Sequence, residues 1–339
     1  MKKILLITTG GTIASTKGEN GLKPGLEIES FLKGLDLPED NLHLSTLELM
    51  AKDSTDMSPE DWVQMAEVIS EACHRGYEGV VLTHGTDTMS YTCAALTHLV
   101  GALPIPVILT GSQLPMDAEN SDGPKNLRDA IIVSLMDISG VFLVFDGSVM
   151  DGASVRKVES VERHAFISVD GKEIGEVYEE QLELTTYGKQ RVNEAGKKDD
   201  FYSLENYAKI NMEYRPAIIK IVPGMDGDII RFYADKGVVA IIIEAFGTGG
   251  IPEYIMPDLE YAVEKNIRIY VTTQCLKGGT HMEVYEVNTR VLELGKGSRT
   301  VKNKDELNCS EDINPAVGVI EAGNKTVEYI YTGLILGKI

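Results

Sequence analysis

The sequence predicts an α/β protein of two domains, in which a larger N-terminal domain holds a mostly parallel sheet flanked by helices and a smaller C-terminal domain is also α/β. Short runs of apolar, often β-branched residues recur along the chain, as in buried parallel strands. Most of them end in glycine and hydroxyl residues and are followed by segments of helical length, which is typical of βαβ crossovers. A chain of 339 residues also exceeds the roughly 250 to 300 residues at which a single core stops growing.

The first predicted strand leads into an unusual turn. Residues 4–7 are apolar and are followed by the segment TTGGT at residues 8–12. Ligands of open α/β sheets bind beyond the carboxyl ends of the strands, so this turn lies where a site is expected. Its glycine spacing fits neither a dinucleotide fingerprint nor a phosphate loop. Thr12 is therefore a candidate nucleophile, and the alternative is that its hydroxyl only hydrogen-bonds its own turn.

The next strand also ends in polar side chains. Residues 42–49 alternate like a strand and lead to Asp53, Ser54 and Thr55, ahead of a helix predicted over residues 59–75. Because these three residues follow a strand and precede the helix cap, we expect their side chains to be available to a ligand at the same edge of the sheet.

A third strand, predicted over residues 79–83, breaks into the segment HGTDTM at residues 84–89, where a helix running to about residue 100 begins. Thr86 and Asp87 therefore lie near a helix N-terminus, where anionic groups are favoured. The alternative is that these two side chains only cap the helix.

Two more strands complete the N-terminal pattern. The strand at residues 106–110 leads to Ser112, and the strand at residues 140–145 leads to a polar segment that ends in Lys157. Acyl transfer needs a nucleophile and a base, and a lysine is a candidate base. Burial lowers the pKa of a lysine whereas an adjacent carboxylate raises it, and the sequence leaves both possibilities open.

The C-terminal part of the chain shows a second α/β pattern. Residues 189–215 are charged, broken by glycine and without periodicity, so they predict a linker between an N-terminal domain over residues 1–188 and a C-terminal domain over residues 216–339. Apolar β-branched runs separated by helical lengths lie at residues 218–222, 238–243 and 267–272. After residue 288 we expect helices.

Composition narrows the classes of function. The formal net charge of −20 argues against binding to nucleic-acid backbones or anionic membranes. Without a signal-type segment or a long apolar run, the chain is expected to be cytoplasmic. The 4 cysteines and 6 histidines show none of the spacings of zinc ligands, so we expect no metal site.

Two segments together resemble a known family. TGGTIAS at residues 9–15 and THGTDTM at residues 83–89 look like the paired signature of the bacterial-type L-asparaginases. The resemblance extends through further segments and is greatest to the cytoplasmic, type I branch. These segments are DSTDM at 53–57, TGS at 110–112, DGPKNL at 122–127, DGASVRK at 151–157 and TQC at 273–275.

The resemblance implies a hydrolase without a cofactor, assembled as a homodimer or homotetramer, with its site between the two domains. It would convert L-asparagine to L-aspartate and ammonia through an acyl-enzyme. Thr12 would be the nucleophile, and Thr86, Asp87 and Lys157 would form a proton-transferring triad.

The same resemblance assigns residues that bind the substrate. Ser54 would hold the α-carboxylate, Asp87 and Asp53 the α-ammonium group, with Thr55 beside them, and Ser112 would lie near the leaving amide. This assignment agrees with the chemistry of a zwitterionic amino acid, which needs a carboxylate and hydrogen-bond donors in one pocket.

Two departures from the family pattern bear on function. Residues 15–25 are polar and glycine-rich and are expected to form a mobile lid loop, but the tyrosine that family members often carry there is replaced by Leu22. Tyr285 is the candidate substitute, with a core or interface tyrosine as the alternative. Glu244 stands where allosteric type I enzymes carry an arginine, so hyperbolic kinetics are expected.

Three other functions stay open. The first is a mixed glutaminase-asparaginase. Glutamine is longer than asparagine by one methylene, and a pocket discriminates against one methylene by only about 1 to 3 kcal/mol. The ammonia-supplying subunit of a tRNA-dependent amidotransferase carries an extra N-terminal domain, whereas this chain enters its first strand at Lys3, and the acidic charge argues against tRNA. A catalytically silent amino-acid-binding regulator is the third.

Overall fold

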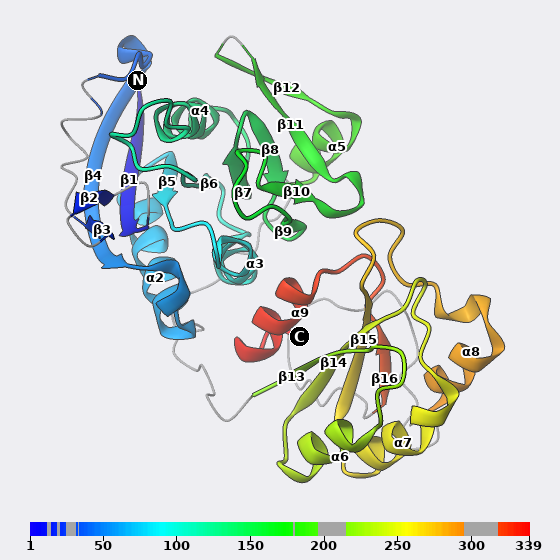
Figure 1. Ribbon diagram of the computed structural model, residues 1–339. Helices are drawn as coiled ribbons and strands as arrows, with labels where there is room; N and C mark the ends of the chain where they lie inside the picture. The colour runs from blue at the N-terminus through cyan, green and yellow to red at the C-terminus, as the bar shows by residue number, and fades with distance from the viewer. Residues whose placement is uncertain are drawn as a thin grey trace. The chain divides into compact units, whose positions relative to one another are not determined.

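A computed structural model describes residues 1–11, 15–18, 21–24, 32, 34–178, 180–195, 215–294 and 318–339. The chain divides into two compact units, Met1–Ile210 and Asn211–Ile339, and each is described by itself (Figure 1). Both units contain a sheet with parallel strands and flanking helices, so the predicted two-domain α/β class is confirmed.

The N-terminal unit is built on an eight-stranded sheet of order β12-β11-β8-β7-β6-β5-β1-β4. The strands β4, β1, β5, β6 and β7 are parallel, whereas β8, β11 and β12 pair in antiparallel fashion. Their bounds are β1 Lys2–Gly10, β4 Leu42–Lys52, β5 Gly79–Thr83, β6 Pro106–Thr110, β7 Gly140–Phe145, β8 Ser148–Asp151, β11 Glu173–Tyr178 and β12 Gln181–Leu184.

Helices cover both faces of this sheet because its central strands are apolar on both sides. Every residue of β5, β6 and β7 is buried. Ile4 and Leu6 pack with residues of α4 (Gly123–Ser134) on one face. The helices α2 (Pro59–His74) and α3 (Met89–Val100) pack against each other and against strands of the sheet (Figure 1).

The parallel strands end at one level, as the sequence predicts. Thr8 pairs with Thr83, and Thr83 pairs with Thr110, so β1, β5 and β6 finish side by side. Gly11 follows β1 with φ of 80°, and a Cβ atom there would lie 2.5 Å from the backbone of Gly85. Only glycine lets the two turns approach so closely.

Two hairpins accompany the N-terminal sheet. The strands β2 (Ser15–Gly18) and β3 (Gly21–Pro24) pair in antiparallel fashion. The prediction of an irregular loop there was wrong, because these strands are polar and lack the apolar alternation that reveals a strand. The second hairpin joins β9 (Val155–Lys157) to β10 (Phe166–Ser168) and carries Lys157 at the end of β9.

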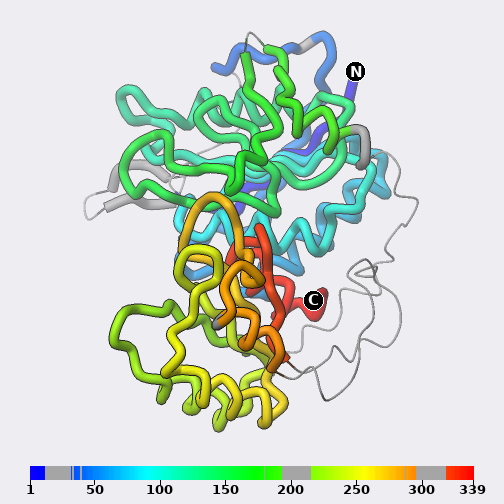
Figure 2. The backbone as a smooth tube through the Cα atoms, turned by 90° about the vertical axis from the view of Figure 1, so that its right-hand side faces the viewer, coloured from blue at the N-terminus to red at the C-terminus, as the bar shows by residue number. Residues whose placement is uncertain are grey.

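The C-terminal unit contains four parallel strands in the order β13-β14-β15-β16. Ile241 and Ile243 pack with residues of α6 and α7, whereas Ala240 and Ile242 pack with residues of α9. The helices α6 and α7 therefore cover one face of this sheet and α9 covers the other (Figure 1 and Figure 2). The bounds are β13 Ala217–Lys220, α6 Asp228–Asp235, β14 Ala240–Ala245, α7 Met256–Glu264, β15 Arg268–Thr273, α8 Glu286–Glu293, β16 Val319–Glu321 and α9 Val327–Ile335.

The structure agrees only in part with two sequence predictions, the helices expected after residue 288 and the linker expected over residues 189–215. Helices α8 and α9 lie in the region where helices are expected. The strand β16 in the same region was not predicted, because a strand of three residues is too short to show a pattern. Helix α5 (Thr186–Ala195) covers the start of the predicted linker, and residues 196–214 lie outside the described part. No helix among the described residues has the length and apolarity to cross a membrane.

Candidate active site

Turns that are far apart in the sequence meet at the carboxyl ends of the N-terminal strands. A Cβ atom on Gly85 would lie 2.7 Å from the side chain of Ser54, so these two turns touch. Ser54 is buried, its Oγ accepts the amide N–H of Asp87 at 3.3 Å, and its carbonyl accepts the hydroxyl of Thr88 at 2.6 Å. The structure thus brings the predicted residues Ser54 and Asp87 together.

Asp53 begins the short 3₁₀ turn Ser54–Asp56 and is held by Thr55. Its carboxylate accepts the backbone N–H of Thr55 at 2.9 Å and the hydroxyl of Thr55 at 2.8 Å. These two hydrogen bonds lower the pKa of Asp53, so its carboxylate is charged at neutral pH. Thr55 therefore holds the carboxylate of Asp53 in place.

Three predicted catalytic residues form one cluster. The Nζ atom of Lys157 donates to Asp87 Oδ1 at 2.7 Å and to Thr86 Oγ1 at 2.9 Å. The side chain of Lys157 is only 16% exposed, whereas that of Asp87 is 61% exposed. The amine is therefore largely withdrawn from water and the carboxylate of Asp87 is open to solvent.

Gln113 also contacts the cluster and was not predicted from the sequence. The hydroxyl of Thr86 donates to Gln113 Oε1 at 3.1 Å. The adjacent residue Ser112 is buried and its hydroxyl donates to the carbonyl of Leu114 at 2.5 Å. The sequence signal for Gln113 was its place directly after Ser112 in a strand-end turn, but no spacing rule singles out an amide there.

Asn126 fixes this turn through buried hydrogen bonds and was likewise missed as a site residue. It is fully buried, and its Nδ2 donates to the carbonyl of Gly111 at 3.0 Å and to Asp122 Oδ2 at 3.1 Å. Its Oδ1 accepts the amide N–H of Asp146 at 2.9 Å. One side chain therefore ties together the turns that follow β6 and β7.

The remaining sequence candidates lie elsewhere. Thr12 lies outside the described residues, and so does the side chain of Leu22 on β3. Tyr285 belongs to the C-terminal unit, directly before α8, and its side chain is 60% exposed. Glu244 is half-buried on β14. The roles of these residues stay predictions.

A buried hydrogen-bond chain lies beneath the turn that carries Thr86. His84 Nδ1 lies 2.7 Å from the carbonyl oxygen of Gly85, and His84 Nε2 lies 2.9 Å from Thr92 Oγ1. Trp62 Nε1 donates to the same Thr92 oxygen at 3.1 Å. Since a carbonyl only accepts and an indole N–H only donates, Nδ1 carries the proton of a neutral His84 and Thr92 donates to Nε2.

We expect protonation of His84 to destabilise the protein between about pH 6.5 and pH 4. Burial lowers the pKa of His84 from 6.5 to about 4, although the bond to Gly85 and the charge of Asp61 oppose the shift. The unfolded chain therefore takes up this proton first, and stability decreases as the pH falls through this range, by on the order of 3 kcal/mol in total.

Urea unfolding at pH 7 and at pH 5 measures this loss of stability. The signal is the fluorescence of Trp62, because the chain has a single tryptophan. The His84→Gln variant cannot titrate at this position and is expected to lose less stability between the two pH values. Equal losses in the variant and the wild type would contradict the prediction.

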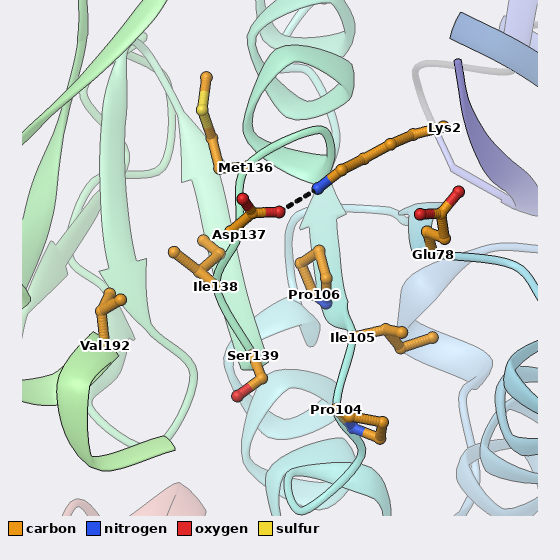
Figure 3. Close-up of a pocket in the computed structure, with 10 residues that line it drawn as sticks. All are labelled: Lys2, Glu78, Pro104, Ile105, Pro106, Met136, Asp137, Ile138, Ser139 and Val192. Carbon is orange, nitrogen blue, oxygen red and sulfur yellow. Dashed lines mark hydrogen bonds and ion pairs between the residues drawn. The ribbon is translucent and has the colours of Figure 1, made fainter. Parts of the chain in front are cut away.

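The described residues also line an open cavity to which no residue of this cluster contributes (Figure 3). It has a volume of about 320 Å³ and lies at the amino ends of β1, β6 and β7, whereas Thr86 follows the carboxyl end of β5. Lys2 and Asp137 form an ion pair across it at 2.5 Å. In the described part of the chain, no group of three or more His, Cys, Asp or Glu side chains could hold a metal ion.

Comparisons with known proteins cover both units of the chain. Residues 3–189 match the family model described as "Asparaginase, N-terminal", and residues 216–336 match "Glutaminase/Asparaginase C-terminal domain". The chain is 36% identical over 297 residues to an L-asparaginase of Thermococcus kodakarensis, with 86% of each protein covered. It is 32% identical over 304 residues to a subunit of the Glutamyl-tRNA(Gln) amidotransferase of Methanococcus vannielii, which covers 87% of this chain and 70% of that protein.

Two solved structures that are similar to this chain are also L-asparaginases. The thermostable L-asparaginase from Thermococcus kodakarensis superposes with a TM-score of 0.82 at 31% identity, over 98% of this chain and 92% of that one. L-asparaginase I from Vibrio cholerae superposes with a TM-score of 0.79 at 28% identity, over 99% of this chain and 93% of that one.

Proposed function

Since the chain belongs to the asparaginase family, whose models match both of its domains, we propose that it hydrolyses L-asparagine to L-aspartate and ammonia. The observation that carries this proposal is the contact of Lys157 with Thr86 and Asp87 at the carboxyl edge of the sheet. The relatives support it, because one that is 36% identical is an L-asparaginase. The likeness to L-asparaginase I from Vibrio cholerae agrees with the type I branch.

In the proposed reaction, the hydroxyl oxygen of Thr12 attacks the side-chain amide carbon of asparagine. Its proton passes to the pair formed by Thr86 and an uncharged Lys157, and a proton then goes to the nitrogen that leaves as ammonia. A water molecule attacks the resulting ester carbon, which releases aspartate and returns a proton to the oxygen of Thr12. General acid–base help of this kind contributes about 10²- to 10⁴-fold to a rate.

The substrate is proposed to be held through its charged α-groups. Asp53 and Asp87 would contact the α-ammonium group, which suits the charged state of Asp53. Ser54 lies next to Asp87 and would hold the α-carboxylate, with Thr55 supporting Asp53. Ser112 would lie near the leaving amide.

Further assignments extend this proposal to the whole protein. We assign to Tyr285 the part of the family's lid tyrosine, which hydrogen-bonds the nucleophile. The active form would be a cytoplasmic homodimer or homotetramer that needs no cofactor. The formal charge of −20 supports a protein that binds neither nucleic acids nor anionic membranes.

The rate of ammonia release at increasing concentrations of L-asparagine and of L-glutamine tests the function. We expect turnover of asparagine with a hyperbolic dependence on concentration, because the carboxylate of Glu244 would repel an effector carboxylate. A sigmoidal curve would contradict the second expectation. Unchanged rates in both the Thr12→Ala and Thr86→Ala variants would refute the mechanism, and the ratio of the two substrates decides between an asparaginase and a mixed glutaminase-asparaginase.

A second candidate function follows from the relative described as a Glutamyl-tRNA(Gln) amidotransferase subunit, which is 32% identical. The chain would then supply ammonia to a partner enzyme rather than release it. Purified protein without any partner distinguishes the two functions: steady hydrolysis of free asparagine supports the asparaginase, whereas turnover that requires a tRNA-bound partner supports the amidotransferase.

A further inference from the structure

The side chain of Gln113 accepts a hydrogen bond from the hydroxyl of Thr86. Its Oε1 lies 3.1 Å from Thr86 Oγ1. Gln113 is half-buried, and its backbone N–H donates to Asp122 Oδ2 at 2.9 Å, which anchors it in the turn after β6. A residue outside the predicted triad is therefore in direct contact with the triad and is held there by the fold.

The direction of this hydrogen bond is set by the other end of the amide. Gln113 Nε2 donates to the backbone carbonyl of Glu162 at 3.1 Å. A carbonyl oxygen only accepts, so the NH₂ group must face Glu162 and the amide oxygen must face Thr86. That amide oxygen also only accepts, and the proton between the two side chains therefore belongs to Thr86.

The three side chains therefore form a chain of hydrogen bonds in which each donor is fixed. Lys157 donates to the oxygen of Thr86 at 2.9 Å, and Thr86 donates onward to Gln113. Each donation makes the next one stronger, so the hydroxyl of Thr86 presents its oxygen, and not its proton, to the amine of Lys157. The proposed transfer of a proton to Lys157 needs the opposite order, in which the hydroxyl of Thr86 donates to an uncharged amine.

We propose that Gln113 is a positioning residue that holds the proton of the Thr86 hydroxyl away from Lys157 and thereby sets the pH at which the triad can accept a proton. This inference rests on the proposed function, because it concerns the same triad. A carboxylate at position 113 would hold the proton on Lys157 up to higher pH, and an apolar side chain there would release it at lower pH.

Lys157 contacts one ionisable group directly, and others lie on its own hairpin and on the helix packed against it; all of them are kept in the test variants. Asp87 contacts its amine directly at 2.7 Å. The other charged or titratable residues of the hairpin that carries Lys157 and of the packed helix α3 are Arg156, Glu159, Glu162, Arg163, His164, Tyr91, Cys93 and His98. His164 lies 3.5 Å from Asp146. None of these groups changes when Gln113 is replaced.

The test compares the pH dependence of kcat/KM for asparagine in the wild type, Gln113→Glu and Gln113→Leu. We expect the acid limb of the profile to move to higher pH in Gln113→Glu, by about one pH unit, and to lower pH in Gln113→Leu. On the acid limb, a shift of one unit is about a tenfold change in rate at fixed pH. A merely structural role would lower activity in both variants without opposite shifts.

Gln181→Glu is the matched control, because Gln181 is exposed on β12 at the far edge of the same sheet. It is expected to leave the acid limb in place. Titration of the Lys157 amine by NMR, with its signal assigned from Lys157→Met, gives a readout that needs no turnover. Opposite shifts of its midpoint in the two variants support the inference.

Shifts in the same direction, or no shift, would overturn the inference even if asparagine is hydrolysed. If the wild type releases no ammonia, the proposed function fails, and the NMR titration still decides the role of Gln113. Melting temperatures of the variants identify any loss of folding, in which case Gln113→Met replaces Gln113→Leu.

Discussion

Replacing Lys157 with methionine is expected to lower kcat for asparagine by about 10²- to 10⁴-fold, with a much smaller change in KM. Methionine keeps the unbranched chain but cannot accept a proton from Thr86. The loss of the ion pair with Asp87 should cost little stability, because Asp87 is 61% exposed and remains hydrated. Activity should therefore fall without a matching fall in melting temperature.

Lys157→Arg separates proton transfer from a purely electrostatic role. Arginine keeps the positive charge beside Asp87 but does not give up its proton at any working pH. We expect this variant to be as impaired as Lys157→Met. Lys236→Met is the matched control on the exposed end of α6 and should keep full activity. A kcat within about threefold of the wild type in Lys157→Arg would contradict the assignment of Lys157 as a base.

Asn126→Asp is expected to destabilise the N-terminal unit by about 3 to 5 kcal/mol at neutral pH. The substitution keeps the shape of the side chain but turns the Nδ2 donor into an oxygen. That oxygen would face the carbonyl of Gly111 and the carboxylate of Asp122, at the positions now 3.0 and 3.1 Å from the amide nitrogen. Because the site is fully buried, no water can screen the repulsion.

Urea unfolding followed by the fluorescence of Trp62 measures this effect. The deficit should shrink as the pH falls, since a protonated carboxyl group at position 126 is neutral and can donate again. Asn266→Asp makes the same chemical change at an exposed position with φ of 64°, which aspartate tolerates, and should change stability little. Equal stability of Asn126→Asp and the wild type at pH 7 would refute the role given to Asn126.

The strands were predictable from sequence because they depend on local patterns, and so was the meeting of the candidate residues Thr86, Asp87 and Lys157 beside the strand ends. Residues 79–83 form β5 as predicted. Thr86 and Asp87 follow this strand, and Lys157 reaches them from the end of β9 in the β9–β10 hairpin. The β2–β3 hairpin was not predictable, because its polar strands show no apolar period. Strand β16 was too short to show one.

The supporting residues Gln113 and Asn126 escaped prediction for a different reason. Each acts through hydrogen bonds between turns that are distant in the sequence, and such contacts leave no periodic or spacing signal. Thr86 and Gln113 are 27 positions apart, and Asn126 reaches Asp146 across 20 positions. The residue types at these positions are informative only once the strand order is known.

The strand order has a consequence for how the protein gains activity during folding. Strand β1 lies between two strands that come later in the chain, since Lys2 pairs with Leu42 and Ile4 pairs with Gly79. Such non-local pairing slows folding, because long loops must close before any contact compensates for the lost entropy. A nascent chain therefore cannot assemble its reactive turns one by one. They form together, when the central strands have joined, and a partly folded chain is expected to be catalytically silent.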